Sequence, residues 1–255
     1  MGNNEEMYHI GLTKNNLEGA KYALLTGDPG RVDDIAKRAK NYKKLNVKRE
    51  YTSYLVELDG EKVLIISTGM GGPSTAICVE ELAMLGIEYL IRIGTSGGMQ
   101  LDVEAGDIVV AQAAIRQEGT SKEYLPIEFP AVADINVTNA LIEAAKELKC
   151  KIHTGVVQCK DSFYGQHSPE RMPISYELEN KWQAWLKAGT LCSEMETASL
   201  YTVSQVLKLH AGAVLLVIWN QERENAGLDN KNDFDTTKEI DVAILAVRKL
   251  ICQNK

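Results

Sequence analysis

The feature that most constrains the fold is an abrupt change from a strand pattern to a helix pattern at a glycine-rich turn. The apolar run VLIIST from Val63 ends in Gly69, Gly71 and Gly72, and Pro73 follows where a helix would take its first turn. Glycine tolerates positive φ and close approach of other atoms, and the amides of a helix N-terminus attract anions. The turn is therefore a candidate anion site, although many such corners bind nothing and spacing alone favours that plainer interpretation.

Apolar runs alternate with helical patterns along the rest of the chain. We expect strands at residues 22–25, 89–93, 107–115, 152–159 and 213–219, and helices at 31–39, 73–85, 136–148, 177–187, 197–209 and 236–251. Residues 44–67 should form a hairpin around Asp59-Gly60, the glycines after residue 93 should end that strand, and residues 127–134 and 160–175 should be loops. Because wholly apolar strands alternate with helices and no linker divides them, we predict one α/β domain over residues 1–255 with its sheet covered on both faces.

Composition excludes several classes of protein. The net charge of −7 and the lack of a basic block argue against a nucleic-acid surface. Five scattered cysteines without CxxC spacing predict neither disulfides nor a zinc site. The acidic N-terminus lacks the apolar run of a signal peptide, and no segment approaches the ~20 apolar residues of a membrane span. We therefore expect a cytoplasmic protein with no nucleic-acid or membrane partner.

Three arginines are candidates for binding an anion, because ligands of open α/β sheets lie beyond the carboxyl ends of strands. Arg31 follows the first strand and the turn GDPG, and Arg49 lies in the predicted hairpin. Taken singly, each is more typical of a surface residue. Arg92 is different, because it lies in a strand between apolar neighbours, where a guanidinium is costly without an anionic partner.

The glycine-rich stretch STGMGGPSTAICVEEL, residues 67–82, resembles the signature of the nucleoside phosphorylase family, which includes uridine phosphorylases and hexameric purine nucleoside phosphorylases. Four more segments follow that family's order: YHIGL at 8–12, GDPGR at 27–31, RIGTSGG at 92–98 and SEMET at 193–197. The resemblance implies a mixed central sheet flanked by helices on both faces. It also implies reversible phosphorolysis of a nucleoside, with inorganic phosphate as co-substrate and without a redox cofactor or catalytic metal.

The resemblance gives the three arginines a common task. Residues that match Arg31, Arg49 and Arg92 bind phosphate in this family, together with those that match Gly27 and Thr95. The chemistry agrees, because several rigid guanidinium forks can hold a phosphate dianion in a pocket that excludes water.

The resemblance also implies a ribose site. Glu196 would bind the 2′- and 3′-hydroxyls with help from the Met195 backbone, Glu194 would be a weaker contact, and His9 would hold the 5′-hydroxyl. Without the resemblance, the two glutamates would be interpreted as ordinary partners of a helix dipole, and His9 as an exposed histidine with no role. In related enzymes the residues matching Arg49 and His9 come from the neighbouring subunit, so we expect a homo-oligomer, a hexamer built as a trimer of dimers with shared sites.

The segment DSFYGQ at 161–166 resembles the uridine branch of the family, with Phe163 stacking on the base and Gln166 pairing with its amide edge. That branch has an arginine two residues after the glutamine. Ser168 stands there in this chain, so Arg171 is the nearest candidate. The other implied base contacts are Ser96 and Gly97.

In the implied reaction, phosphate attacks the anomeric carbon of ribose while uracil leaves as an anion, and Arg92, Glu196 and Gln166 carry the catalysis. The purine branch has an aspartate where VIWN places Asn220, and an amide cannot act as a general acid. A purine nucleoside phosphorylase, a nucleosidase and a non-catalytic nucleoside-binding protein remain alternatives. A structural monovalent cation is a further implication of the resemblance, at Glu50, Met70 and Ser74.

Overall fold

The computed structural model describes residues 2 and 4–254. The strands of this part of the chain form one mixed sheet in the order β10-β6-β8-β9-β5-β1-β4-β3-β2, with β7 paired to β6. Their bounds are β1 Tyr22–Thr26, β2 Tyr42–Lys48, β3 Tyr51–Leu58, β4 Glu61–Ser67, β5 Tyr89–Gly98, β6 Ile108–Gln117, β7 Ala131–Val132, β8 Ile152–Lys160, β9 Cys192–Glu194 and β10 His210–Asn220.

The sheet closes on itself at one end. Strand β10 pairs with β6 and also with β5, so β10, β6, β8, β9 and β5 form a closed ring. Strands β1, β4, β5 and β10 run parallel, whereas β2, β3 and β4 are antiparallel neighbours. The predicted mixed α/β architecture is therefore confirmed.

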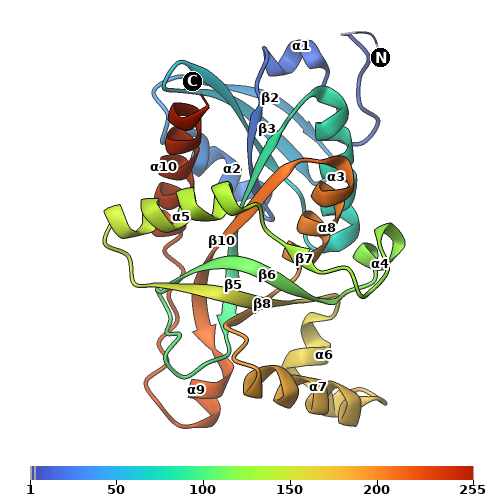
Figure 1. Cartoon of the computed structure of the whole chain (residues 1–255), viewed down its shortest axis with the longest axis vertical. Coiled ribbons are helices and arrows are strands. Elements are labelled where there is room, and N and C mark those ends of the chain that lie inside the picture. The colour runs from blue at the N-terminus through green and yellow to red at the C-terminus, as the bar shows by residue number, and fades with distance from the viewer. Residues whose placement is uncertain (1, 3, 255) are drawn as a thin grey trace.

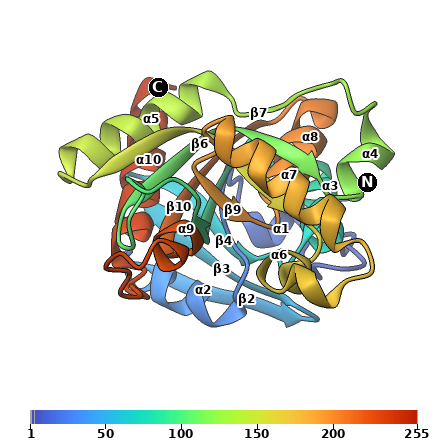
Figure 2. The same ribbon diagram turned by 90° about the horizontal axis from the view of Figure 1, so that it is seen from below.

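Helices cover both faces of the sheet (Figures 1 and 2). The helices are α1 Lys14–Leu17, α2 Pro29–Ala36, α3 Gly72–Leu85, α4 Thr120–Tyr124, α5 Ile135–Glu147, α6 Phe163–His167, η1 Pro169–Arg171, α7 Ser175–Lys187, α8 Thr197–Leu207, α9 Gln221–Asn225 and α10 Thr237–Gln253. One buried apolar cluster includes Leu82 of α3 and Leu200 of α8, and the other includes Val32 of α2, Leu141 of α5 and Val247 of α10.

The glycine-rich corner is built as its sequence predicts. Gly71 caps α3 with φ +92°, Pro73 occupies the first turn, and Gly86 ends the helix in the left-handed region. A Cβ at Gly72 would lie 2.5 Å from the Ser199 hydroxyl, so this glycine allows α8 to approach closely.

Two sequence expectations were wrong about strands. Residues 42–67 form three strands rather than one hairpin, because the chain turns once more at Arg49 before the predicted turn at Asp59-Gly60. Strand β5 does not end at Gly94 but continues to Gly98. A Cβ at Gly94 would lie 2.8 Å from the Arg92 guanidinium and from Leu215, so this glycine permits close packing within a strand.

Both predicted loops contain regular structure. Residues 127–134 include the short strand β7, and residues 160–175 include α6 and η1. Ser162 starts α6, because its hydroxyl accepts a hydrogen bond from the Gly165 amide. The five cysteines are free, as predicted. Within residues 2 and 4–254, none of the helices has the length and apolar character needed to cross a membrane.

Candidate active site

A pocket of about 520 Å³ is lined by residues at the carboxyl ends of the parallel strands. In Figure 1 the carboxyl ends of β5 and β10 point toward the end of the molecule that carries α6, α7 and α9. Because β1, β5 and β10 run in the same direction, the residues that follow or end them meet at this edge. Most of the residues expected at the site line this pocket: Gly27, Arg31, Arg92, Thr95, Ser96, Gly97, Phe163, Glu194, Met195 and Glu196.

A buried ion cluster forms the floor of the pocket. Arg92 donates from Nε to Glu194 Oε2 at 3.1 Å and from Nη2 to Glu196 Oε2 at 2.5 Å. All three side chains are buried. Burial opposes the charge of Arg92, but Glu196 and Glu194 outweigh it and raise the pKa of the guanidinium. The sequence argument that Arg92 needs an anionic partner is confirmed, and its partners are two carboxylates.

The glycine-rich corner binds an anion that belongs to the protein itself. The Gly71 amide donates to Glu196 Oε1 at 2.6 Å. Glu194 accepts hydrogen bonds from the backbone amides of Glu196 and Thr197, at 2.9 and 3.0 Å, at the start of α8. Burial raises the pKa of Glu196, against the attraction of Arg92. These contacts fix the Glu196 carboxylate between the corner and the arginine.

Arg31 is the second cation of the pocket. Its Nε lies 3.9 Å from Asp28, and its Nη1 is buried without a hydrogen-bond partner in the described part of the chain. Burial lowers the pKa of Arg31, and the positive charge of Arg92 lowers it further. Two guanidinium groups that repel each other, one with an unused buried donor, favour an anionic ligand between them.

His9 and Arg49 lie outside the residues that line this pocket. The His9 ring and Glu81 Oε1 are 2.6 Å apart, and the backbone amides of His9 and Ile10 also donate to that carboxylate. Arg49 is exposed at a turn with φ +56°, and its guanidinium lies 5.7 Å from the centroid of the Tyr8 ring. The Tyr8 ring also lies 4.8 Å from the His9 ring between centroids, so Tyr8 contacts both of these residues.

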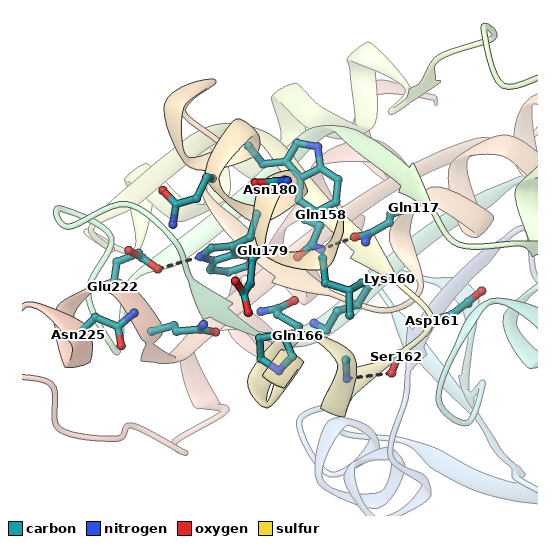
Figure 3. A pocket seen from close by; sticks show the side chains of 17 residues that line it. Gln117, Gln158, Lys160, Asp161, Ser162, Gln166, Glu179, Asn180, Glu222 and Asn225 are labelled. Atoms are coloured by element: carbon teal, nitrogen blue, oxygen red, sulfur yellow. Dashed lines mark hydrogen bonds between the residues drawn. The ribbon is translucent and has the colours of Figure 1, made fainter. Parts of the chain in front are cut away.

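The residues expected at the base are divided between two pockets. Phe163 of α6 lines the first pocket, is 51% exposed, and packs its ring 4.3 Å from that of His167. Gln166 lines a neighbouring pocket of about 500 Å³ (Figure 3), and its carboxamide oxygen accepts a 2.7 Å hydrogen bond from the Ser193 hydroxyl. Arg171 lines neither pocket and is exposed.

Lys160 is a pocket residue that the sequence reasoning missed. It ends β8, is 5% exposed, and lines both pockets. Its ammonium donates to Ser193 Oγ at 2.6 Å. Burial lowers the pKa of Lys160, and burial together with the charge of Lys160 lowers the pKa of His167 to about 4. The sequence held no comparable signal, because Lys160 follows the predicted strand and opens a polar segment, and its burial results from β8 continuing to Lys160.

Two further expectations concern residues around the pocket. Glu50 and Met70 line it, a Cβ at Gly69 would lie 2.9 Å from the Glu50 side chain, and the Ser74 hydroxyl donates to the Met70 carbonyl at 3.3 Å. Asn220 is fully buried. Its amide nitrogen donates to two backbone carbonyls and its oxygen caps α9, so the side chain is occupied by structural contacts.

Sequence comparison places these features in a wider group of proteins. The profile of the family described as "Phosphorylase superfamily" matches residues 21–251. A uridine phosphorylase of Treponema pallidum is 51% identical, with 97% of this chain and 95% of the relative covered. A uridine phosphorylase of Salmonella typhimurium is 41% identical over 96% of this chain and 98% of the relative. A guanosine phosphorylase of Halorubrum lacusprofundi is 39% identical over 78% of each chain.

Proposed function

The chain belongs to the phosphorylase superfamily, and on that premise we propose that it is a uridine phosphorylase, a pentosyltransferase that reversibly converts uridine and phosphate into uracil and ribose 1-phosphate. The observation that carries the proposal is the full-length similarity to uridine phosphorylases at 51% and 41% identity. The cluster of Arg92, Glu194 and Glu196, which holds a cation and two carboxylates in one pocket, is consistent with it.

Phosphate would bind between Arg31 and Arg92, with Gly27 and Thr95 beside it. Two observations support this placement. Arg31 has a buried donor without a partner, and the two carboxylates on Arg92 occupy its Nε and Nη2 and leave Nη1 without a hydrogen bond to the described residues. The two guanidinium groups would replace water around the phosphate, which is the nucleophile and must lose part of its hydration before it attacks the anomeric carbon.

Glu196 would bind the ribose hydroxyls and stabilise the positive charge that develops on the sugar. A carboxylate offers two acceptors that match a cis-diol, and its negative charge favours a positive ribosyl centre. The bonds from Gly71 and Arg92 hold this carboxylate in place before substrate arrives, which reduces the reorganisation needed during the reaction. Met195 and Glu194 line the same pocket.

The site would be completed by a second subunit. His9 and Arg49 do not line the pocket of their own chain, and Glu81 holds the His9 segment in a defined position. We assign both residues to the partner's site, the assembly to a hexamer, and the protein to the cytoplasm. Glu50, Met70 and Ser74, which lie close together, would supply the oxygen ligands of a structural monovalent cation near that interface.

The test is uracil release from uridine by the purified protein, with and without phosphate. Release only with phosphate is expected, together with little base release from inosine or guanosine. Release without phosphate would identify a nucleosidase, and faster cleavage of guanosine than of uridine would identify a purine enzyme, which the 39% identical guanosine phosphorylase keeps as the second candidate. If the protein released no base from uridine, inosine or guanosine, it would be a binding protein.

A further inference from the structure

Lys160 carries a buried positive charge whose ionic partner is missing. The side chain lies at the carboxyl end of β8 with 5% of its surface exposed. No carboxylate in the described part of the chain forms an ion pair with its ammonium, and Glu194 and Glu196 act on it only through space. A buried ammonium without a paired carboxylate is costly, and an anion in the pocket would lower that cost.

The surroundings of Lys160 place this charge at the base end of the pocket. Its ammonium lies 5.9 Å from the centroid of the Phe163 ring. It also donates to Ser193 Oγ, and that hydroxyl donates in turn to the carboxamide oxygen of Gln166. The chain of bonds from Lys160 through Ser193 fixes the orientation of Gln166 and leaves the amide NH₂ of Gln166 available as a donor. Figure 3 shows Lys160 and Gln166 beside each other.

The other cations are placed differently. Arg171 is exposed, and its guanidinium lies 5.9 Å from the Tyr164 ring centroid rather than in the pocket. The His167 imidazole lines the pocket, but burial and the charge of Lys160 keep it neutral near pH 7 by lowering its pKa to about 4. Lys160 is therefore the cation beside Phe163 and Gln166 among the residues that line the pocket.

We propose that Lys160 is a catalytic residue that stabilises the departing uracil anion, with Ser193 as a positioning residue that links it to Gln166. This inference rests on the proposed function. As the bond between C1′ and N1 breaks, its electron pair moves onto the uracil ring, and a phosphate oxygen forms the new bond to C1′. Lys160 keeps its proton throughout and acts by charge, so its contribution is largest in the transition state, where the uracil charge develops.

Leaving-group dependence tests this role. Lys160→Met removes the charge at similar length, and its kcat/KM for uridine should fall about 100-fold. Fluorine at C5 makes the base more acidic, so 5-fluorouracil needs less stabilisation as it leaves. In Lys160→Met, the fold decrease of kcat/KM with 5-fluorouridine should therefore be about 10-fold smaller than the fold decrease with uridine. Lys160→Arg should restore part of the uridine activity, and the KM for phosphate should be unchanged.

Three controls keep the test decisive. Lys146→Met, at an exposed position on α5, should match the wild type with both substrates. Ser193→Ala should weaken uridine binding, but its loss of kcat/KM should be the same for uridine and 5-fluorouridine, because this change removes no charge. The proposal would be overturned if Lys160→Met lost the same factor of kcat/KM with uridine and with 5-fluorouridine. It would also be overturned if Arg171→Ala, and not Lys160→Met, showed a larger loss with uridine than with 5-fluorouridine. Phosphate-dependent cleavage by the wild type is measured first, so that failure of the proposed function is seen separately.

Discussion

The carboxyl group of Glu239 should make the stability of this protein fall as the pH rises. Glu239 lies at the start of α10, is fully buried, and neither of its oxygens has a hydrogen-bond partner among residues 2 and 4–254. Burial raises its pKa from 4.5 to about 7, Arg31 attracts the ionised form, and Asp235 and Asp233 oppose it. The folded protein therefore binds this proton more tightly than the unfolded chain.

The sign and size of the effect follow from linkage. The stabilisation from the raised pKa is complete below about pH 4.5 and is lost as the pH rises through 7. The rise from 4.5 to about 7 corresponds to about 3 kcal/mol. Glu239→Gln stays neutral at every pH, so the free energy of unfolding of the variant, minus that of the wild type, should grow by about 3 kcal/mol between pH 4 and pH 8.

Urea unfolding followed by tryptophan fluorescence measures this difference, at one protein concentration because association of the proposed oligomer would also contribute to stability. Any difference in packing between the amide and the acid is the same at each pH, so it does not change the slope. Glu143→Gln, at an exposed position on α5, is the matched control and should show a difference independent of pH. If the difference in free energy of unfolding between Glu239→Gln and the wild type did not change with pH, the reasoning would be refuted.

Three other variants test the site. Arg92→Ala should lower kcat/KM by at least about 100-fold, and it should also lower the free energy of unfolding by about 3–5 kcal/mol because two buried carboxylates lose their partner; near-normal turnover would contradict the phosphate site. Gln166→Ala should raise the KM for uridine and leave the KM for phosphate unchanged, and unaltered uridine kinetics would remove it from the base site. Glu81→Ala should release the His9 segment and lower kcat/KM about 10-fold with an unchanged pocket, and normal kinetics would argue against a role for that segment.

Features with a local chemical cause were predictable from the sequence. The boundaries of α3 follow from Gly71, Pro73 and Gly86, because a helix that starts after a residue with positive φ and ends in the left-handed region selects glycine at both ends. The buried pairing of Arg92 was predictable for a similar reason, since its apolar neighbours on the strand leave an ion partner as the way to bury the charge.

Features that depend on distant residues were not predictable in the same way. The two partners of Arg92 lie 102 and 104 residues away, and no local pattern identifies them. Gly94 reads as the end of a strand, yet packing against Leu215 keeps it inside one. Lys160 reads as the first residue of a polar loop, and its role in the pocket follows from contacts with Ser193 that the sequence alone does not reveal.

The closed ring of strands also determines the order in which the protein can be assembled. Strand β5 has β9 and β10 as its ring neighbours, and both are synthesised long after it. A nascent chain that has just passed β5 therefore carries an open strand edge, which is a site for pairing with other chains. The ring around the strand that carries Arg92 is completed only when β10 has left the ribosome, so the sheet beside the binding pocket is among the last parts of the molecule to close.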